Sequence, residues 1–167
     1  MADTKNTTAA QVAITVMRVL VGWHFLYEGI AKLSNPTWSA AGYMKAARGP
    51  FAGLFRWIAS QPNLLENANT ITMYGLAIVG VLLILGLFTR LAAVGGMGFI
   101  LLFYLCNPPF VGYFYSLPTE GSYLVVNKNL VEAAALVVIL VTGSGRAAGL
   151  DRIIHGLWRR RTQPPSR

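Results

Sequence analysis

The chain has 167 residues, of which 54% are hydrophobic and 12% are charged, and its formal net charge is +8 at pH 7. This composition, with a mean hydropathy of +0.51, excludes an ordinary soluble domain and indicates a membrane protein. The length allows several spanning helices of roughly 20 apolar residues each, and therefore one domain over residues 1–167. The lone Cys106 excludes an intramolecular disulfide, and the two distant histidines make a metal or haem site unexpected.

Four apolar segments are expected to cross the membrane as helices. They cover about residues 12–33, 71–87, 91–105 and 123–141. The second and third form one apolar block that is too long for a single span, and Arg90 near its middle predicts a tight turn at residues 88–90. The expected fold class is all-α, an integral membrane four-helix bundle.

Two longer connections should lie at the same end of this bundle. Residues 34–69 mix aromatic and basic side chains and are broken at Gly49-Pro50, so we expect helical pieces lying in the membrane interface, apolar side down. Residues 107–122, with the sequence NPPFVGYFYSLPTEGS, are rich in proline, glycine and aromatics. This composition predicts an ordered cap rather than a flexible linker.

The basic residues concentrate in the tail, residues 146–167, which holds six arginines. Four spans place both termini on one side, and these arginines assign that side to the cytoplasm. Three cations in the first connection, Lys45, Arg48 and Arg56, oppose this topology but are outnumbered. A pI near 10 indicates nucleic acid in a soluble protein; here we interpret the tail as an anchor beside anionic lipid, with no nucleic-acid partner.

The first helix carries four ionisable residues, at Arg18, His24, Glu28 and Lys32. At 100° per residue they occupy one sector of roughly 120°, and charged groups in spans normally face the protein interior or a wet cavity. The fourth helix carries a second polar group, at Lys128, Asn129 and Glu132, and the third delivers Asn107 to the same outer end. Because the first helix runs outward and the fourth runs inward, Glu132 should lie near the level of His24.

Two interpretations of these groups stay open. In the structural one, Glu28 pairs with Lys128, or Glu132 with Arg18, and the pairs only fix helix packing, while Lys32 reaches the headgroups. In the functional one, the groups form a proton-handling or ligand site, because intramembrane ionisable residues are functional candidates by default. The candidate catalytic residues are then Glu28, His24 and Glu132, and the candidate ligand-binding residues are Arg18, Lys32, Asn107, Lys128 and Asn129. Cys106 is expected to be inert.

The segment RVLVGWHFLYEGIAKLSNPTWSAAGYMKAARGPF, residues 18–51, resembles the opening of the DoxX/DoxD family of small four-helix membrane proteins. The later NPPF, EGSYLVVNKNLVEAAAL and GLDRII are similar to the family's third loop, fourth helix and tail. The resemblance is greatest to the branch named for the small subunit of a thiosulfate:quinone oxidoreductase. It implies a protein of the cytoplasmic (inner) membrane of a prokaryote and electron transfer to quinone, with a partner subunit on another chain.

These observations lead to three functional hypotheses. The first is a membrane subunit of an oxidoreductase that binds quinone or a similar hydrophobic ligand in the outer half of the bundle and handles its protons. The alternative is a non-enzymatic anchor for a partner protein. A carrier of protons or small anions is the weakest, because the inner halves of the second and third helices are almost wholly apolar. Expected partners are membrane lipid, the quinone-like ligand, and a partner subunit or a second copy.

Overall fold

The computed structural model describes the backbone of residues 2–110, 112 and 124–162 and the side chains of residues 7–110, 112 and 124–157. This part of the chain is all-helical. Its helices are α1 (Ala2–Leu33), α2 (Ala41–Lys45), α3 (Ala52–Ser60), α4 (Pro62–Leu85), α5 (Thr89–Cys106), α6 (Lys128–Thr142), α7 (Ser144–Ala147) and α8 (Leu150–Thr162). Most of the connection expected at 107–122 lies outside the described residues, so its capping role stays a prediction.

Three of the described helices are long and apolar enough to cross a membrane: residues Thr7–Leu33 of α1, and the whole of α4 and α5. The chain is therefore a multi-pass membrane protein. The fourth span expected at 123–141 is seen as a shorter helix, because the side chain of Asn127 caps α6 by accepting from the Leu130 amide at 3.3 Å. The 15 residues of α6 extend about 22 Å, less than the roughly 30 Å hydrocarbon core.

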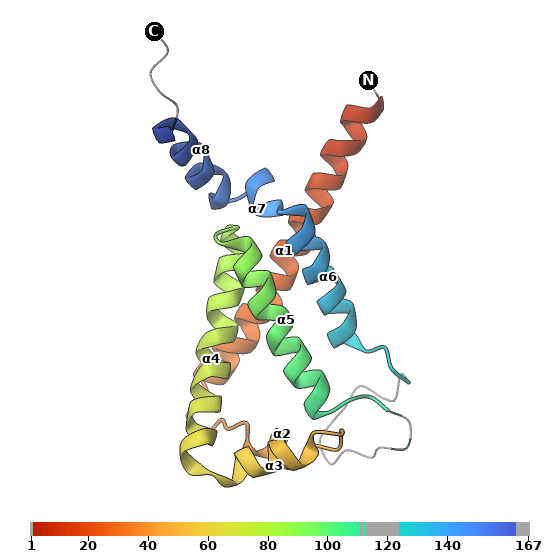
Figure 1. The fold of residues 1–167 in the computed structure, drawn as a ribbon, viewed down its shortest axis with the longest axis vertical. Helices are drawn as coiled ribbons and strands as arrows, with labels where there is room; N and C mark the ends of the chain where they lie inside the picture. Colours follow the sequence, from red (N-terminus) through yellow and green to blue (C-terminus); the bar gives the residue numbers. More distant parts are fainter. Residues whose placement is uncertain (1, 111, 113–123, 163–167) are drawn as a thin grey trace.

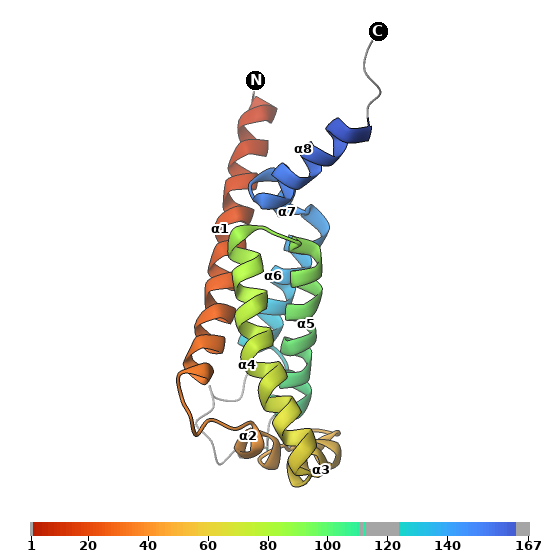
Figure 2. The ribbon, with the colours of Figure 1, turned by 90° about the vertical axis from the view of Figure 1, so that its left-hand side faces the viewer.

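Successive long helices run in opposite directions, and the chain connects them at two ends (Figures 1 and 2). The α4–α5 turn, the start of α1, α7 and α8 lie at one end, whereas α2 and α3 lie across the other. We call these the terminal end and the α2–α3 end. A buried apolar core between α1, α4, α5 and α6 is formed by residues that include Phe25, Leu83, Ile100 and Leu136.

Helix α4 begins well before the residue expected for it. Pro62 stands in the first turn, where its missing amide donor is unimportant. The first two turns contain Asn63, Glu66 and Asn67, so a search for apolar runs starts the helix near residue 71 instead. At its other end, Gly86 has φ +63° and stops α4, and α5 begins at Thr89. The turn therefore occupies residues 86–88, slightly earlier than expected.

Helices α1 and α4 approach closely through glycines. A Cβ atom on Gly29 would lie 2.5 Å from the Ala77 nitrogen, and one on Gly22 would lie 3.0 Å from the carbonyl oxygen of Gly80. Gly80 itself faces the backbone of Leu26, with no room for a side chain. Small residues let helices in lipid pack backbone to backbone, so these positions determine how α1 crosses α4.

Helices α2 and α3 supply the helical pieces expected in the first connection. Helix α3 buries Ala52, Phe55 and Ala59 toward the protein. Its other side exposes Leu54 and Trp57. An amphipathic helix lying across the end of membrane spans is suited to the interface, where apolar side chains reach the acyl chains.

Candidate functional site: a polar cavity at the α2–α3 end

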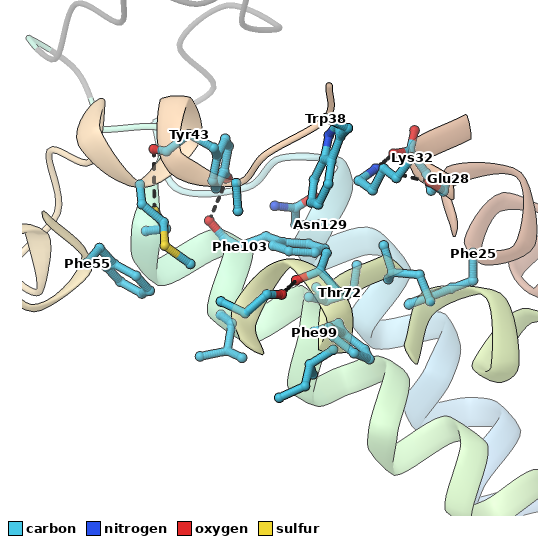
Figure 3. A pocket seen from close by; sticks show the side chains of 18 of the residues that line it. Phe25, Glu28, Lys32, Trp38, Tyr43, Phe55, Thr72, Phe99, Phe103 and Asn129 are labelled. Carbon is cyan, nitrogen blue, oxygen red and sulfur yellow. Dashed lines mark hydrogen bonds and ion pairs between the residues drawn. The ribbon is translucent and has the colours of Figure 1, made fainter. Parts of the chain in front are cut away.

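A cavity of about 600 Å³ lies among α1, α4, α5 and α6 beside α2 and α3 (Figure 3). This volume is in the range of small-molecule sites. Its walls are mainly apolar and aromatic, and its polar groups come mostly from α1, α6 and the α1–α2 connection. The polar and ionisable lining residues are His24, Glu28, Lys32, Ser39, Tyr43, Thr72, Lys128, Asn129 and Glu132.

His24 and Glu132 join α1 to α6 at the edge of this cavity. The Nδ1 atom of His24 lies 2.7 Å from Oε1 of Glu132, a distance suited to a charge-assisted hydrogen bond. The two side chains differ in exposure: that of Glu132 is 10% exposed and that of His24 is 45% exposed. The pair therefore consists of an accessible imidazole and a largely buried carboxylate that orients it.

A second charged pair lies on α1 itself. Lys32 donates to the Glu28 carboxylate four residues earlier, and its Nζ also lies 3.2 Å from the Glu28 carbonyl oxygen. The same ammonium stands 5.7 Å from the centre of the Trp38 ring, within the range of a cation–π contact (Figure 3). Trp38 lies in the connection between α1 and α2, so the charged end of α1 and the last residues of this connection form one wall.

Helix α2 is fastened over the cavity by backbone-directed hydrogen bonds. The Tyr43 hydroxyl donates to the Phe103 carbonyl oxygen on α5 at 2.9 Å (Figure 3). At the start of α2, the Ala40 amide donates to Oδ1 of Asn69 on α4 at 2.8 Å. These contacts tie α2 to two spans, so the first connection is an ordered part of the site.

Asn107 and Cys106 lie beside α2 at the end of α5, and of the two only Cys106 lines the cavity. Nδ2 of Asn107 donates to the Tyr43 carbonyl oxygen at 3.2 Å, so Asn107 supports α2 and is not among the residues that line the cavity. Cys106 is 2% exposed, and its sulfur lies 3.7 Å from that same oxygen. Burial of this kind suits the inert role expected for the thiol.

The predicted site is largely assembled by the fold. Of the eight candidate residues, six line the cavity: His24, Glu28, Lys32, Lys128, Asn129 and Glu132. The expectation that Glu132 reaches the level of His24 is confirmed. The salt bridges differ from the two pairs considered in the structural interpretation: Glu28 pairs with Lys32, and Glu132 pairs with His24.

Arg18 lies outside this cavity, toward the terminal end. It is six residues before His24, which is about 9 Å along a helix. Its side chain is 2% exposed, and Nη2 donates to the Ala148 carbonyl oxygen at 2.6 Å. The polar residues of α1 thus serve two places, and Arg18 holds the chain that follows α7 rather than the ligand site.

Sequence reasoning missed the part of the site supplied by the first connection and by α4. In the sequence, Trp38 and Tyr43 belong to the aromatic residues of 34–69 that are expected in the membrane interface, and Thr72 falls inside the apolar span expected at 71–87. The dense aromatic content of residues 34–69 is the signal that a structured cap is present. No pattern in the sequence shows that this cap folds back over Phe103. Among the described residues, no group of three or more His, Cys, Asp or Glu side chains could hold a metal ion.

The spanning helices and the cavity at one end define a multi-pass helical membrane protein with a largely apolar cavity that polar groups enter from α1 and α6. A family model agrees with this class and makes it specific: the DoxX model matches residues 13–106, more than half of the chain. The chain belongs to the DoxX family. No significant match was found among curated proteins or among solved structures. The matched region stops at the end of α5, so the part of the cavity contributed by α6 lies beyond it.

Proposed function

We propose that this protein is a membrane subunit of an oxidoreductase complex that binds a quinone, or a similar hydrophobic ligand, in the cavity and handles its protons. The observation that carries the proposal is the His24–Glu132 pair at the edge of an aromatic cavity. Quinone reduction consumes two electrons and two protons, and the protein must supply shape, hydrogen bonds and a proton route.

The residues present fit such a ligand. Phe25, Phe99, Ile100 and Phe103 form apolar walls for a flat ring or its isoprenoid tail. Asn129 and Lys128 at the first turn of α6, and Tyr43 on α2, bring hydrogen-bonding groups to the same cavity. A ligand with a small polar head and a large apolar body matches this division.

The pairs assign different roles to the two carboxylates. Glu132, largely buried, accepts from the imidazole and keeps His24 oriented, so His24 is the group that delivers a proton to a ligand oxygen. Glu28, held by Lys32, is more exposed and stands one helical turn from His24. It is placed to return a proton to His24 from the solvent outside the cavity.

The electrons enter from a donor outside the part of the chain that the structure describes. We assign them to a partner subunit, as the resemblance to the small subunit of a thiosulfate:quinone oxidoreductase implies. The lone, buried Cys106 does not offer a sulfur relay, so thiosulfate chemistry itself would belong to that partner. In this proposal the protein lies in the cytoplasmic membrane of a prokaryote with both termini on the cytoplasmic side.

Photolabelling with an azidoquinone tests the proposal directly. We expect label on peptides from residues 24–32 of α1, from residues 38–44 and from the start of α6. Unlabelled quinone should compete with this labelling. Glu132→Gln should weaken this labelling, because the imidazole loses a charged partner, whereas Glu66→Gln on the exposed start of α4 should not. Label spread along the lipid-facing sides of α4 and α5, or equal labelling of both variants, would overturn the quinone site.

The alternative function, a membrane anchor for a partner protein, is favoured by one observation: Leu54 and Trp57 on α3 are exposed beside the cations Arg48 and Arg56. In that case a complex isolated in mild detergent should survive Glu132→Gln and be lost when residues 48–57 are replaced by a polar linker. Retention of the partner after that replacement would exclude the anchor role for α3.

A further inference from the structure

The C-terminal helix α8 carries an apolar stripe that nothing in the described protein covers. Leu150, Ile153, Ile154 and Leu157 follow the i, i+3, i+4, i+7 spacing of one helix face. Their exposed fractions are 38%, 58%, 46% and 59%. Four large aliphatic side chains in one row are too many for a helix that only faces water.

The opposite side of α8 is basic. On the helical wheel, Arg152 and Arg159 fall roughly 150° or more from the centre of the apolar stripe, and Arg160 lies at its border. Arg161 falls within the sector of the stripe, one turn beyond Leu157, so α8 holds four arginines and one acidic residue, Asp151. An aliphatic stripe with arginines on the other side and at its C-terminal end is typical of helices that lie in the headgroup region of an anionic bilayer.

Asp151 does not oppose that charge at the surface, because it is bound to the bundle. Its Oδ1 accepts from the Phe88 amide at 2.7 Å and its Oδ2 accepts from the Thr89 amide at 3.0 Å. Its own amide donates to the Gly86 carbonyl oxygen at 2.9 Å. These bonds attach the first turn of α8 to the turn between two membrane spans.

The hydrogen bonds of Asp151 also determine where α8 starts relative to the membrane spans. Helix α4 ends at Leu85 and α5 begins at Thr89, so the turn that binds Asp151 lies where the spans leave the hydrocarbon core. Helix α8 starts at that level and runs obliquely outward, away from the ends of α4 and α5 (Figures 1 and 2). A bilayer around the spans therefore reaches the start of the stripe, at the first turn of α8.

We propose that α8 is a lipid-binding helix that lies on the bilayer surface, inserts Ile153, Ile154 and Leu157 at the acyl boundary, and places its arginines against anionic headgroups. The occupant of the stripe is lipid rather than protein, because the stripe begins at the membrane boundary and its flanks are cationic. The proposal does not depend on the ligand of the cavity.

Spin labelling of the full-length protein tests this arrangement. In a Cys106→Ser background, a nitroxide is attached at Ile154→Cys in the stripe, or at Gly156→Cys, which is nearly opposite and has no atom within 4 Å of a Cβ. Each protein is placed in nanodiscs of phosphatidylcholine alone, or of equal parts phosphatidylcholine and phosphatidylglycerol. Collisions with oxygen, which dissolves in lipid, and with a water-soluble nickel chelate report the position of each label.

With phosphatidylglycerol, we expect the label at 154 to be reached by oxygen and shielded from nickel, and the label at 156 to stay accessible to nickel. In phosphatidylcholine alone, both labels should be mostly in water. Replacing one arginine, as in Arg159→Gln, should lower the ratio of embedded to exposed label at 154 by about fivefold, because one surface cation is removed.

Three outcomes would overturn the proposal. Equal insertion of the label at 154 in both lipids would show that anionic headgroups do not hold α8 on the bilayer. A label at 154 that stays in water in both lipids would show that bilayer lipid does not cover the stripe and would leave a protein as its occupant. Equal shielding at 154 and 156 would mean that α8 is buried on all sides. In every sample, unchanged tryptophan fluorescence and a single gel-filtration peak show that the bundle is intact.

Discussion

His24 Nδ1 and Glu132 Oε1 stand 2.7 Å apart although 108 positions separate the two residues in the chain. This contact closes α1 onto α6 at the end where α2 and α3 cover the cavity. It places an imidazole and a buried carboxylate side by side in the lining of that cavity. The helix packing and the proposed proton chemistry thus depend on the same pair.

A double-mutant cycle measures how strongly this pair is coupled. His24→Gln, Glu132→Gln and the double variant should give a coupling free energy of about 0.5–1 kcal/mol, a modest value because the His24 side chain is 45% exposed. Thermal or denaturant unfolding in detergent provides the measurement. The same cycle with Glu66→Gln in place of Glu132→Gln serves as control and should show no coupling.

The Tyr43 hydroxyl should strengthen ligand binding, because it holds α2 over the cavity. Tyr43→Phe removes the 2.9 Å hydrogen bond to the Phe103 carbonyl oxygen while leaving the ring in place, so α2 loosens over the cavity. A net loss of about 1 kcal/mol corresponds to roughly fivefold weaker binding of a quinone analogue. Tyr27→Phe, on the exposed side of α1, is the matched control. Equal binding by Tyr43→Phe and the wild type would remove α2 from the binding site.

The α1–α4 crossing should not tolerate a single methyl group at Gly80. Gly80→Ala places a Cβ against the Leu26 backbone, which cannot move aside as a flexible side chain would. Overpacking of this kind costs about 1–3 kcal/mol and lowers the unfolding temperature in detergent. Gly98→Ala provides the comparison, since a Cβ at Gly98 meets no atom within 4 Å. A Gly80→Ala protein as stable as Gly98→Ala would mean that the helices are farther apart than described.

Asp151 caps the start of α5 from a distant part of the chain. Asp151→Ala removes the acceptors of the Phe88 and Thr89 amides and should destabilise the protein by about 0.5–2 kcal/mol. Asp151→Asn, which keeps one carbonyl oxygen, should lose less. Proteolysis within α8 should also be faster in the Ala variant, because the tether to the Gly86 turn is weakened. If proteolysis is unchanged, α8 is attached by other contacts.

A variant of Arg18 tests whether the terminal end contributes to ligand binding at the α2–α3 end. Arg18→Met keeps much of the buried volume but removes the hydrogen bond to the Ala148 carbonyl oxygen, so stability should fall. Binding of a quinone analogue should be unchanged, because Arg18 does not line the cavity. Titration of the variant with that analogue in nanodiscs checks this. Weaker binding of the analogue in a variant that is as stable as the wild type would show that Arg18 contributes to the ligand site.

The sequence by itself determined the class of protein and most of the candidate site. Apolar runs long enough to span a bilayer can be counted directly, and a row of ionisable residues within one must face protein or water. The row of ionisable residues on α1 required polar partners on another helix. Because the first and fourth helices run in opposite directions, Glu132 could be placed at the depth of His24, and this predicted the contact between α1 and α6. The start of α4 was missed because its first turns are polar, and α6 was overestimated because an apolar run does not show where Asn127 caps the helix.

Only the tertiary structure decided which charges pair and what covers the cavity. Helical periodicity gives the face of a residue but not its neighbour across a gap, so Glu28 could be assigned to Lys128 although it pairs with Lys32. The same limit hid the separation of Arg18 from His24, since one helix face can meet different partners at different depths. The Tyr43–Phe103 and Asp151–Thr89 bonds join segments far apart in the chain. Their partners are backbone groups, which carry no sequence signal, and folding alone brings them together.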